Sequence, residues 1–220
     1  MTLVKICGIT NLEDARDAIE CGADALGFNF FPKSPRYIAP GAAKDIDTKI
    51  REYAAVKTVG VFVNEPLDKV LETAIYANID VIQLHGDEST GYVGDIKTLS
   101  GLAVIKAFRV NENMTIAELR KYRLAVDDPN DEFSGILLDS YSPGVYGGSG
   151  LIADRKFAMT AARELFRIYL AGGLNPENVR QAVQQVRPFA VDVASGVESS
   201  PVKKDRDKVA AFVAAAKGAL

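Results

Sequence analysis

Histidine, cysteine and tryptophan are scarce in this chain of 220 residues, which has one histidine, two cysteines and no tryptophan. Two cysteines, Cys7 and Cys21, cannot build the disulfide framework of a small secreted domain, and we expect both to be reduced thiols. Because His85 is the sole histidine and no CxxC, HExxH or EF-hand spacing occurs, we expect no metal site. Few side chains can therefore carry proton transfer or nucleophilic chemistry.

The sequence also lacks long apolar runs and an excess of basic residues. No run approaches the roughly 18 apolar residues that a membrane span requires, and Lys5 interrupts the apolar N-terminal stretch, so no signal peptide is visible. The net charge of −3 argues against a nucleic-acid surface, which needs clustered lysine and arginine. We therefore expect a cytoplasmic protein without nucleic-acid or membrane partners. The mixed-sign cluster at 203–208 is typical of a solvated helix face.

Short apolar and β-branched runs recur along the chain, and 48% of all residues are apolar, enough for a substantial core. The runs are 3–9, 25–30, 57–63, 81–85, 104–109, 135–139, 168–171 and 190–194. Most are continuously hydrophobic, as in a parallel sheet that is covered on both faces. Segments with helical periodicity lie between them; Asn11 is predicted to cap one helix, and Asn175, followed by a proline, to cap another.

Eight strands that alternate with about eight helices predict an α/β fold, the (β/α)8 TIM barrel, in which residues 1–220 form a single domain. A doubly wound open sheet is the alternative. In such a barrel the active-site residues come from the C-terminal ends of the strands. Cys7 and Asp139 end two of the runs. Cys7 is either a reactive thiol or a small buried hydrophobe, and Asp139 either donates a proton or orders the loop that follows.

Glycine pairs after the last two runs favour a phosphate site. Gly172 and Gly173 follow the seventh run, and Ser195 and Gly196 follow the eighth; exposed backbone N–H groups and a helix N-terminus there attract an anion, although each loop alone could be an ordinary turn. The glycine cluster at 147–150 is a mobile lid, a further source of backbone N–H groups for a phosphate, or a plain loop. Arg36, between prolines and Tyr37, either clamps a substrate carboxylate or pairs with a surface acid.

Motifs at nearly every strand end extend this pattern over the whole chain. They are VKICGIT (4–10), GFNFFPKSPRYI (27–38), VGVFVNEP (59–66), IQLHGDE (82–88), IKAFRV (105–110), LLDSYSPGVYGGSG (137–150), LAGGLNPENV (170–179) and VDVASGVESSP (191–201). In these motifs the chain resembles the phosphoribosylanthranilate isomerases, barrel enzymes of tryptophan biosynthesis. One departure is Val202, where the family commonly has glycine. His85 and Asp192 receive no catalytic role, and we expect each to order a neighbouring loop.

The resemblance implies an Amadori rearrangement of N-(5-phospho-β-D-ribosyl)anthranilate without a cofactor. By motif, Cys7 is the general base, Asp139 is the general acid and Arg36 binds the anthranilate carboxylate. Gly172, Gly173, Ser195 and Gly196 line the phosphate site, helped by Gly147 and Gly148. Either a lowered pKa of Cys7 or a small thiolate fraction must then suffice for the base. The expected partner is a phosphorylated small molecule, and the protein is expected to be a monomer or a homodimer.

Three other functions remain open from the sequence. The ProFAR isomerase of histidine biosynthesis performs the same rearrangement on another amine, but that family uses two aspartates, and Cys7 speaks against it. A metal-dependent sugar-phosphate epimerase lacks the histidines that it would need. A non-catalytic barrel that binds a phosphorylated ligand would keep the glycine loops but has no need of a matched thiol and carboxyl.

Overall fold

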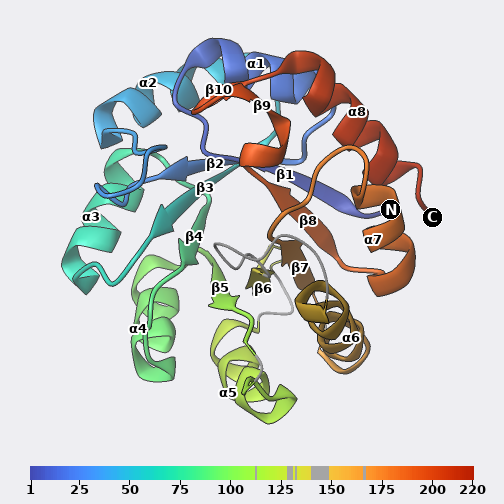
Figure 1. The fold of residues 1–220 in the computed structure, drawn as a ribbon. Helices are drawn as coiled ribbons and strands as arrows, with labels where there is room; N and C mark the ends of the chain where they lie inside the picture. The colour runs from blue at the N-terminus through green and yellow to red at the C-terminus, as the bar shows by residue number, and fades with distance from the viewer. Residues whose placement is uncertain (112, 128–130, 132, 140–148, 166) are drawn as a thin grey trace.

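The eight apolar runs form the eight strands of a closed parallel barrel in the computed structural model (Figure 1). The structure describes all residues except 112, 128–130, 132, 140–148 and 166. The strands are β1 Leu3–Cys7, β2 Ala25–Asn29, β3 Lys57–Phe62, β4 Val81–Leu84, β5 Ala103–Arg109, β6 Gly135–Asp139, β7 Ile168–Ala171 and β8 Ala190–Val193. Each strand coincides with a predicted run, and pairing of β1 with β8 closes the sheet, which excludes the open-sheet alternative.

The helices surround this barrel as an outer ring (Figure 1). They are α1 Leu12–Glu20, α2 Pro40–Ile50, α3 Leu67–Tyr76, α4 Thr90–Ser100, α5 Ile116–Val126, α6 Ser149–Glu164, α7 Val179–Val186 and α8 Arg206–Lys217. Asn11 caps α1 as predicted, because its side chain accepts a hydrogen bond from the backbone N–H of Asp14. No helix in the described part of the chain is long and apolar enough to cross a membrane.

The predicted cap at Asn175 is wrong, because α7 begins only at Val179, with Asn178 at its N-cap. The Asn175 side chain instead accepts hydrogen bonds from the backbone N–H groups of Glu177 and Asn178. It therefore holds a turn that precedes the helix. Side-chain hydrogen bonds of this kind stabilise turns and helix starts alike, so the sequence signal does not separate the two.

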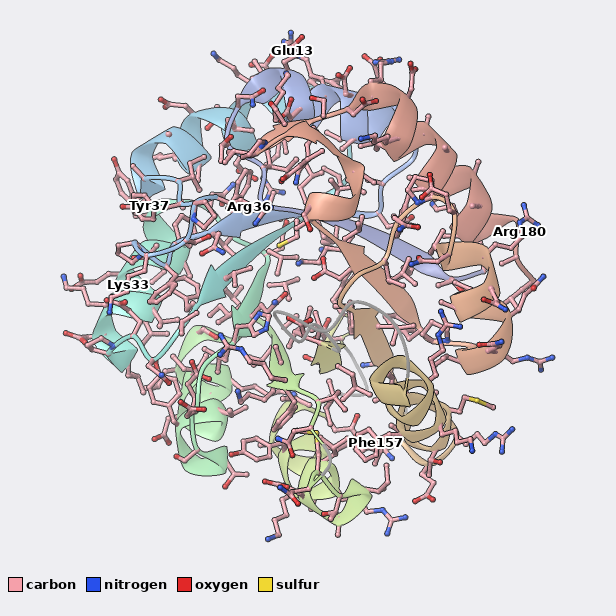
Figure 2. The ribbon with its side chains drawn as sticks, in the orientation of Figure 1. Glu13, Lys33, Arg36, Tyr37, Phe157 and Arg180 are labelled. Carbon is pink, nitrogen blue, oxygen red and sulfur yellow. The ribbon has the colours of Figure 1, made fainter. Side chains whose placement is uncertain are left out.

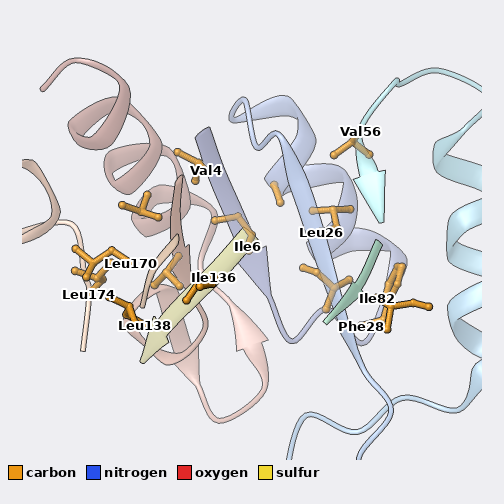
Figure 3. Packing of buried hydrophobic residues seen from close by; sticks show 14 of the residues in the cluster. Val4, Ile6, Leu26, Phe28, Val56, Ile82, Ile136, Leu138, Leu170 and Leu174 are labelled. Atoms are coloured by element: carbon orange, nitrogen blue, oxygen red, sulfur yellow. The ribbon is translucent and has the colours of Figure 1, made fainter. Parts of the chain in front are cut away.

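Two apolar clusters lie on the two faces of the sheet. Between the strands and the helices, the larger cluster includes Val4 and Ile6 of β1 and Ile136 and Leu138 of β6 (Figure 3). The barrel interior holds a smaller cluster, whose members are Ala25, Val59, Val81, Ile105, Ala107, Leu137, Tyr169, Ala171 and Ala190. Successive residues of a strand point to opposite faces. With Val4 and Ile6 directed at the helices, Lys5 and Cys7 face the interior.

A small antiparallel hairpin follows the barrel strands: β9, Glu198–Ser200, pairs with β10, Lys203–Lys204. The cluster at 203–208 is therefore not one solvated helix face. Lys204 is only 3% exposed and donates to Glu198, whereas α8 begins at Arg206. Val202, in the turn of the hairpin, has a φ of 76°, in the left-handed region that favours glycine.

Candidate active site

A cavity of about 370 Å³ opens at the C-terminal ends of the strands, where barrels of this architecture carry their active sites. Its lining includes every predicted site residue that the structure describes: Cys7, Arg36, Asp139, Gly172, Gly173, Ser195 and Gly196. The lining also includes Gln83, His85 and Asp192. Gly147 and Gly148, predicted to help bind phosphate, lie outside the described residues. Residues from seven of the eight strands, or from the loops that follow them, thus converge on one cavity.

Cys7 is the last residue of β1, and the chain turns away from the barrel immediately after it. Gly8 makes this turn with a φ of 78°, and the backbone N–H groups of Gly8 and Ile9 both donate to the Gly27 carbonyl. A Cβ atom at Gly27 would lie 2.7 Å from the Cys7 sulfur, so only glycine leaves room for the thiol. Burial raises the pKa of Cys7, and Lys5 opposes this rise without reversing it. Of the two alternatives for the base, this direction favours a small thiolate fraction over a lowered pKa.

Asp139 ends β6 on another side of the same cavity. One carboxylate oxygen, Oδ2, lies 3.4 Å from Nε2 of His85. On the other side of the imidazole, Nε2 of Gln83 lies 3.2 Å from Nδ1. His85 therefore contacts the carboxylate of the candidate acid, Asp139. The sequence had predicted that His85 orders a neighbouring loop. Oε1 of Gln83 is buried and has no hydrogen-bond partner among the described residues.

Arg36 reaches the cavity from the loop after β2, while Lys33 and Tyr37 of the same loop lie towards the periphery (Figure 2). Its Nε and Nη2 atoms donate to the two carboxylate oxygens of Glu198, over 2.7 and 2.8 Å. Nζ of Lys204 donates to the same carboxylate over 2.9 Å. Burial would raise the pKa of Glu198, but these hydrogen bonds from Arg36 and Lys204 lower it to about 2. The pairing fixes the guanidinium through its Nε and Nη2 atoms.

The two glycine loops lie side by side between the candidate acid and base. Gly172 and Gly173 follow β7 with φ of 88° and 65°, and Ser195 and Gly196 form a short 3-10 turn after β8. A Cβ atom at Gly196 would collide with the carbonyl oxygen of Leu174, so the loops touch through their backbones. Since β6, β7, β8 and β1 are neighbours in the barrel, this glycine backbone lies between Asp139 and Cys7.

Sequence reasoning missed a charged pair formed by Lys5 and Asp192, of which Asp192 lines the cavity. Nζ of Lys5 lies 2.9 Å from Oδ1 of Asp192, and the two residues face each other in the register of β1 and β8. Asp192 thus pairs with a lysine of the barrel instead of ordering a loop. The available signal was the position of Lys5, a charge in an apolar strand two residues before Cys7. No group of three or more histidine, cysteine, aspartate or glutamate side chains in the described part is placed to hold a metal ion.

Comparison with known proteins gives the same family along the whole chain. The family model of N-(5'-phosphoribosyl)anthranilate (PRA) isomerase matches residues 4–215. An N-(5'-phosphoribosyl)anthranilate isomerase from Geobacter sp. (strain M21) is 51% identical over 217 residues, covering 99% of this chain and 98% of the relative.

Solved structures agree with this match. The crystal structure of phosphoribosyl anthranilate isomerase from Thermotoga maritima has a TM-score of 0.85 at 46% identity, covering 99% of this chain and all of that one. A phosphoribosyl anthranilate isomerase in complex with reduced 1-(o-carboxyphenylamino)-1-deoxyribulose 5-phosphate has a TM-score of 0.79 at 43% identity, with the same coverage. The chain therefore belongs to the N-(5'-phosphoribosyl)anthranilate isomerase family.

Proposed function

We propose that this protein is an aldose-ketose isomerase of tryptophan biosynthesis. It converts N-(5-phospho-β-D-ribosyl)anthranilate into 1-(2-carboxyphenylamino)-1-deoxyribulose 5-phosphate by an Amadori rearrangement. The observation that carries the proposal is the convergence of a thiol, a carboxyl, an arginine and two glycine loops on one cavity, in a chain that matches the family from end to end. Ring opening and the tautomerisations that follow each need only a proton given to or taken from the substrate, so acid–base groups are sufficient and no cofactor is needed.

In this mechanism Asp139 acts first. Its protonated carboxyl donates a proton to the ring oxygen of the ribose, and the ring opens to a Schiff base. Cys7, as the thiolate, then takes the proton from C2 of the ribose. The resulting enolamine tautomerises to the ketone. The two residues end β6 and β1, and the phosphate-binding backbone lies between them, so a bound phosphate would hold the sugar within reach of both.

The remaining cavity residues bind the substrate. Gly172, Gly173, Ser195 and Gly196 present backbone and hydroxyl groups to the phosphate. Arg36 binds the anthranilate carboxylate through the part of its guanidinium that Glu198 does not occupy. The buried Oε1 of Gln83 can accept a hydrogen bond from a ribose hydroxyl.

The protein as a whole fits this role as one catalytic domain, residues 1–220, working in the cytoplasm on a phosphorylated small molecule. Neither nucleic acid nor membrane is a partner. We propose a monomer or a homodimer. A solved Thermotoga maritima relative is described as monomers generated from a dimeric isomerase, and light scattering of the purified protein would distinguish the two states.

The decisive experiment follows the loss of substrate fluorescence during turnover. Cys7→Ser and Asp139→Asn should each lower kcat/KM by about 10²–10⁴-fold, the usual contribution of a general acid or base. Cys21→Ser is the matched control, because this second thiol lies at the C-cap of α1 and outside the cavity lining. Its activity should equal that of the wild type. Full activity in either site variant would overturn its assignment, and wild-type binding without turnover would favour the ligand-binding barrel.

A further inference from the structure

Lys5 places a charged side chain at a buried position of a barrel strand. Its side chain is 1% exposed and lies inside the barrel, in an otherwise apolar strand. Asp192 compensates the charge at 2.9 Å. A buried ion pair of this kind is often no more stabilising than apolar side chains of similar volume, because both charges lose their hydration. Stability of the fold therefore does not explain why β1 carries a charge here.

The position of Cys7 offers an explanation. A Cβ atom on Gly27 would lie 2.7 Å from the Cys7 sulfur and 3.1 Å from the Lys5 nitrogen, so both atoms border the same point. The sulfur and the ammonium group are then within about 6 Å of each other, a range in which opposite charges interact strongly. Because Gly27 has no side chain, both groups have the space for this approach.

Four charged groups act on the thiol from the elements around it. Burial is the largest influence and raises the pKa of Cys7; Lys5 on β1 and Lys204 on β10 lower it, and Asp192 on β8 raises it. Arg36, on the loop after β2, is the fourth, because its own pKa responds to the charge on Cys7. Lys5 exceeds the other charges in its effect on the thiol.

We propose that Lys5 is a positioning residue that acts through Cys7: its ammonium group, held by Asp192, stabilises the thiolate form of the catalytic base. The proposal rests on the proposed function, in which Cys7 takes a proton from the substrate. Lys5 keeps its own proton throughout. When the thiolate becomes a thiol, Lys5 remains balanced by Asp192, so the interior never contains an uncompensated lysine. This explains why the pair is needed rather than a lone lysine.

Alkylation of Cys7 by iodoacetamide tests the proposal without any need for turnover. Only the thiolate reacts, so the pH dependence of the rate gives the titration midpoint of Cys7. The Cys21→Ser background leaves one thiol, and Cys7 is partly exposed to the cavity. In this background, Lys5→Met should move the midpoint upward by about 1–3 pH units, the usual effect of a nearby opposite charge. The rising limb of the pH profile of kcat/KM should move by the same amount.

Lys106→Met is the matched control. Lys106 is also 1% exposed, also on a barrel strand and also paired with a carboxylate, Glu88 at 3.0 Å, but it is not among the charged groups that act on Cys7. Its loss should leave the Cys7 midpoint unchanged even if it lowers stability. Lys5→Arg, which keeps the charge, should restore the midpoint towards the wild-type value.

If Lys5→Met does not fold, Asp192→Asn carries the test in the opposite direction. It removes the carboxylate that opposes ionisation of Cys7, so the midpoint should fall. Equal midpoints in wild type, Lys5→Met and Lys106→Met would overturn the proposal. A shifted alkylation midpoint in a protein without isomerase activity would instead keep the Lys5 interaction and reject the proposed function.

Discussion

Gly8 decides where Arg36 can lie. Its φ of 78° is a conformation that side chains rarely adopt, and a Cβ atom there would collide with Cδ of Arg36. The arginine therefore crosses the backbone directly beside Cys7. Glycine at position 8 serves two purposes at once, because it turns the chain away from the thiol and makes room for the guanidinium.

Arg36→Met should weaken substrate binding with little effect on the chemical step. The lost charge-assisted hydrogen bonds contribute about 1.5–3 kcal/mol, so we expect KM to rise by roughly 10–100-fold while kcat changes little. Steady-state kinetics with Lys33→Met as the control measure this, since Lys33 is exposed on the same loop. An unchanged KM in Arg36→Met would mean that Arg36 does not bind the substrate and that its pairing with Glu198 is purely structural.

The candidate base and acid could be predicted one residue at a time, because Cys7 and Asp139 each end an apolar run. The groups that act on them could not. Lys5 and Asp192 are 187 positions apart and meet only through the register of β1 with β8. Likewise, the contact of Arg36 with Glu198 depends on how the hairpin folds back over the barrel. Local patterns do not encode such distant pairings.

Elements with strong apolar patterns were predicted well, and short polar ones were not. The barrel strands end within two residues of the predicted runs. The hairpin of β9 and β10 was missed because its strands have three and two residues, too few for a period of two to emerge. This hairpin nevertheless supplies Glu198 and Lys204, which hold Arg36 in place.

Val202→Gly should stabilise the protein through the turn of this hairpin. Position 202 follows a proline and has a positive φ, the setting in which turns favour glycine. A left-handed conformation costs a residue with a Cβ atom about 1–2 kcal/mol, and glycine gives back part of this as chain entropy. We expect the free energy of unfolding in urea to increase by about 1 kcal/mol. Val202→Ala keeps the Cβ atom and should gain less; equal effects would argue against strain at this position.

At the scale of the whole molecule, acid stability should depend on Glu198. Its pKa is about 2 in the folded protein, against an ordinary value of 4.5, so the folded state favours the ionised carboxylate. This contribution to stability is complete above about pH 4.5 and is lost as the pH falls towards about 2.

Glu198→Gln should therefore be less stable than the wild type at about pH 6 and approach it at about pH 2.5, as measured by urea unfolding. Glu72→Gln, which removes an exposed pair with Lys69, is the control and should change little at either pH. A constant difference between wild type and Glu198→Gln across this range would contradict the linkage.

The barrel as a whole was predictable because its pattern extends over the whole chain: eight buried apolar runs alternate with helices. Closure of the barrel brings Gly196, after β8, against the Leu174 carbonyl, after β7, and the sequence did not predict this contact. Two loops that abut through their backbones cannot rearrange independently, so their glycine backbone is in place before any ligand arrives. Under the proposed function, the substrate phosphate serves as a fixed pivot in these loops, and little of its binding free energy is consumed in ordering the protein. The reactive end of the substrate is left free to change shape as its ring opens.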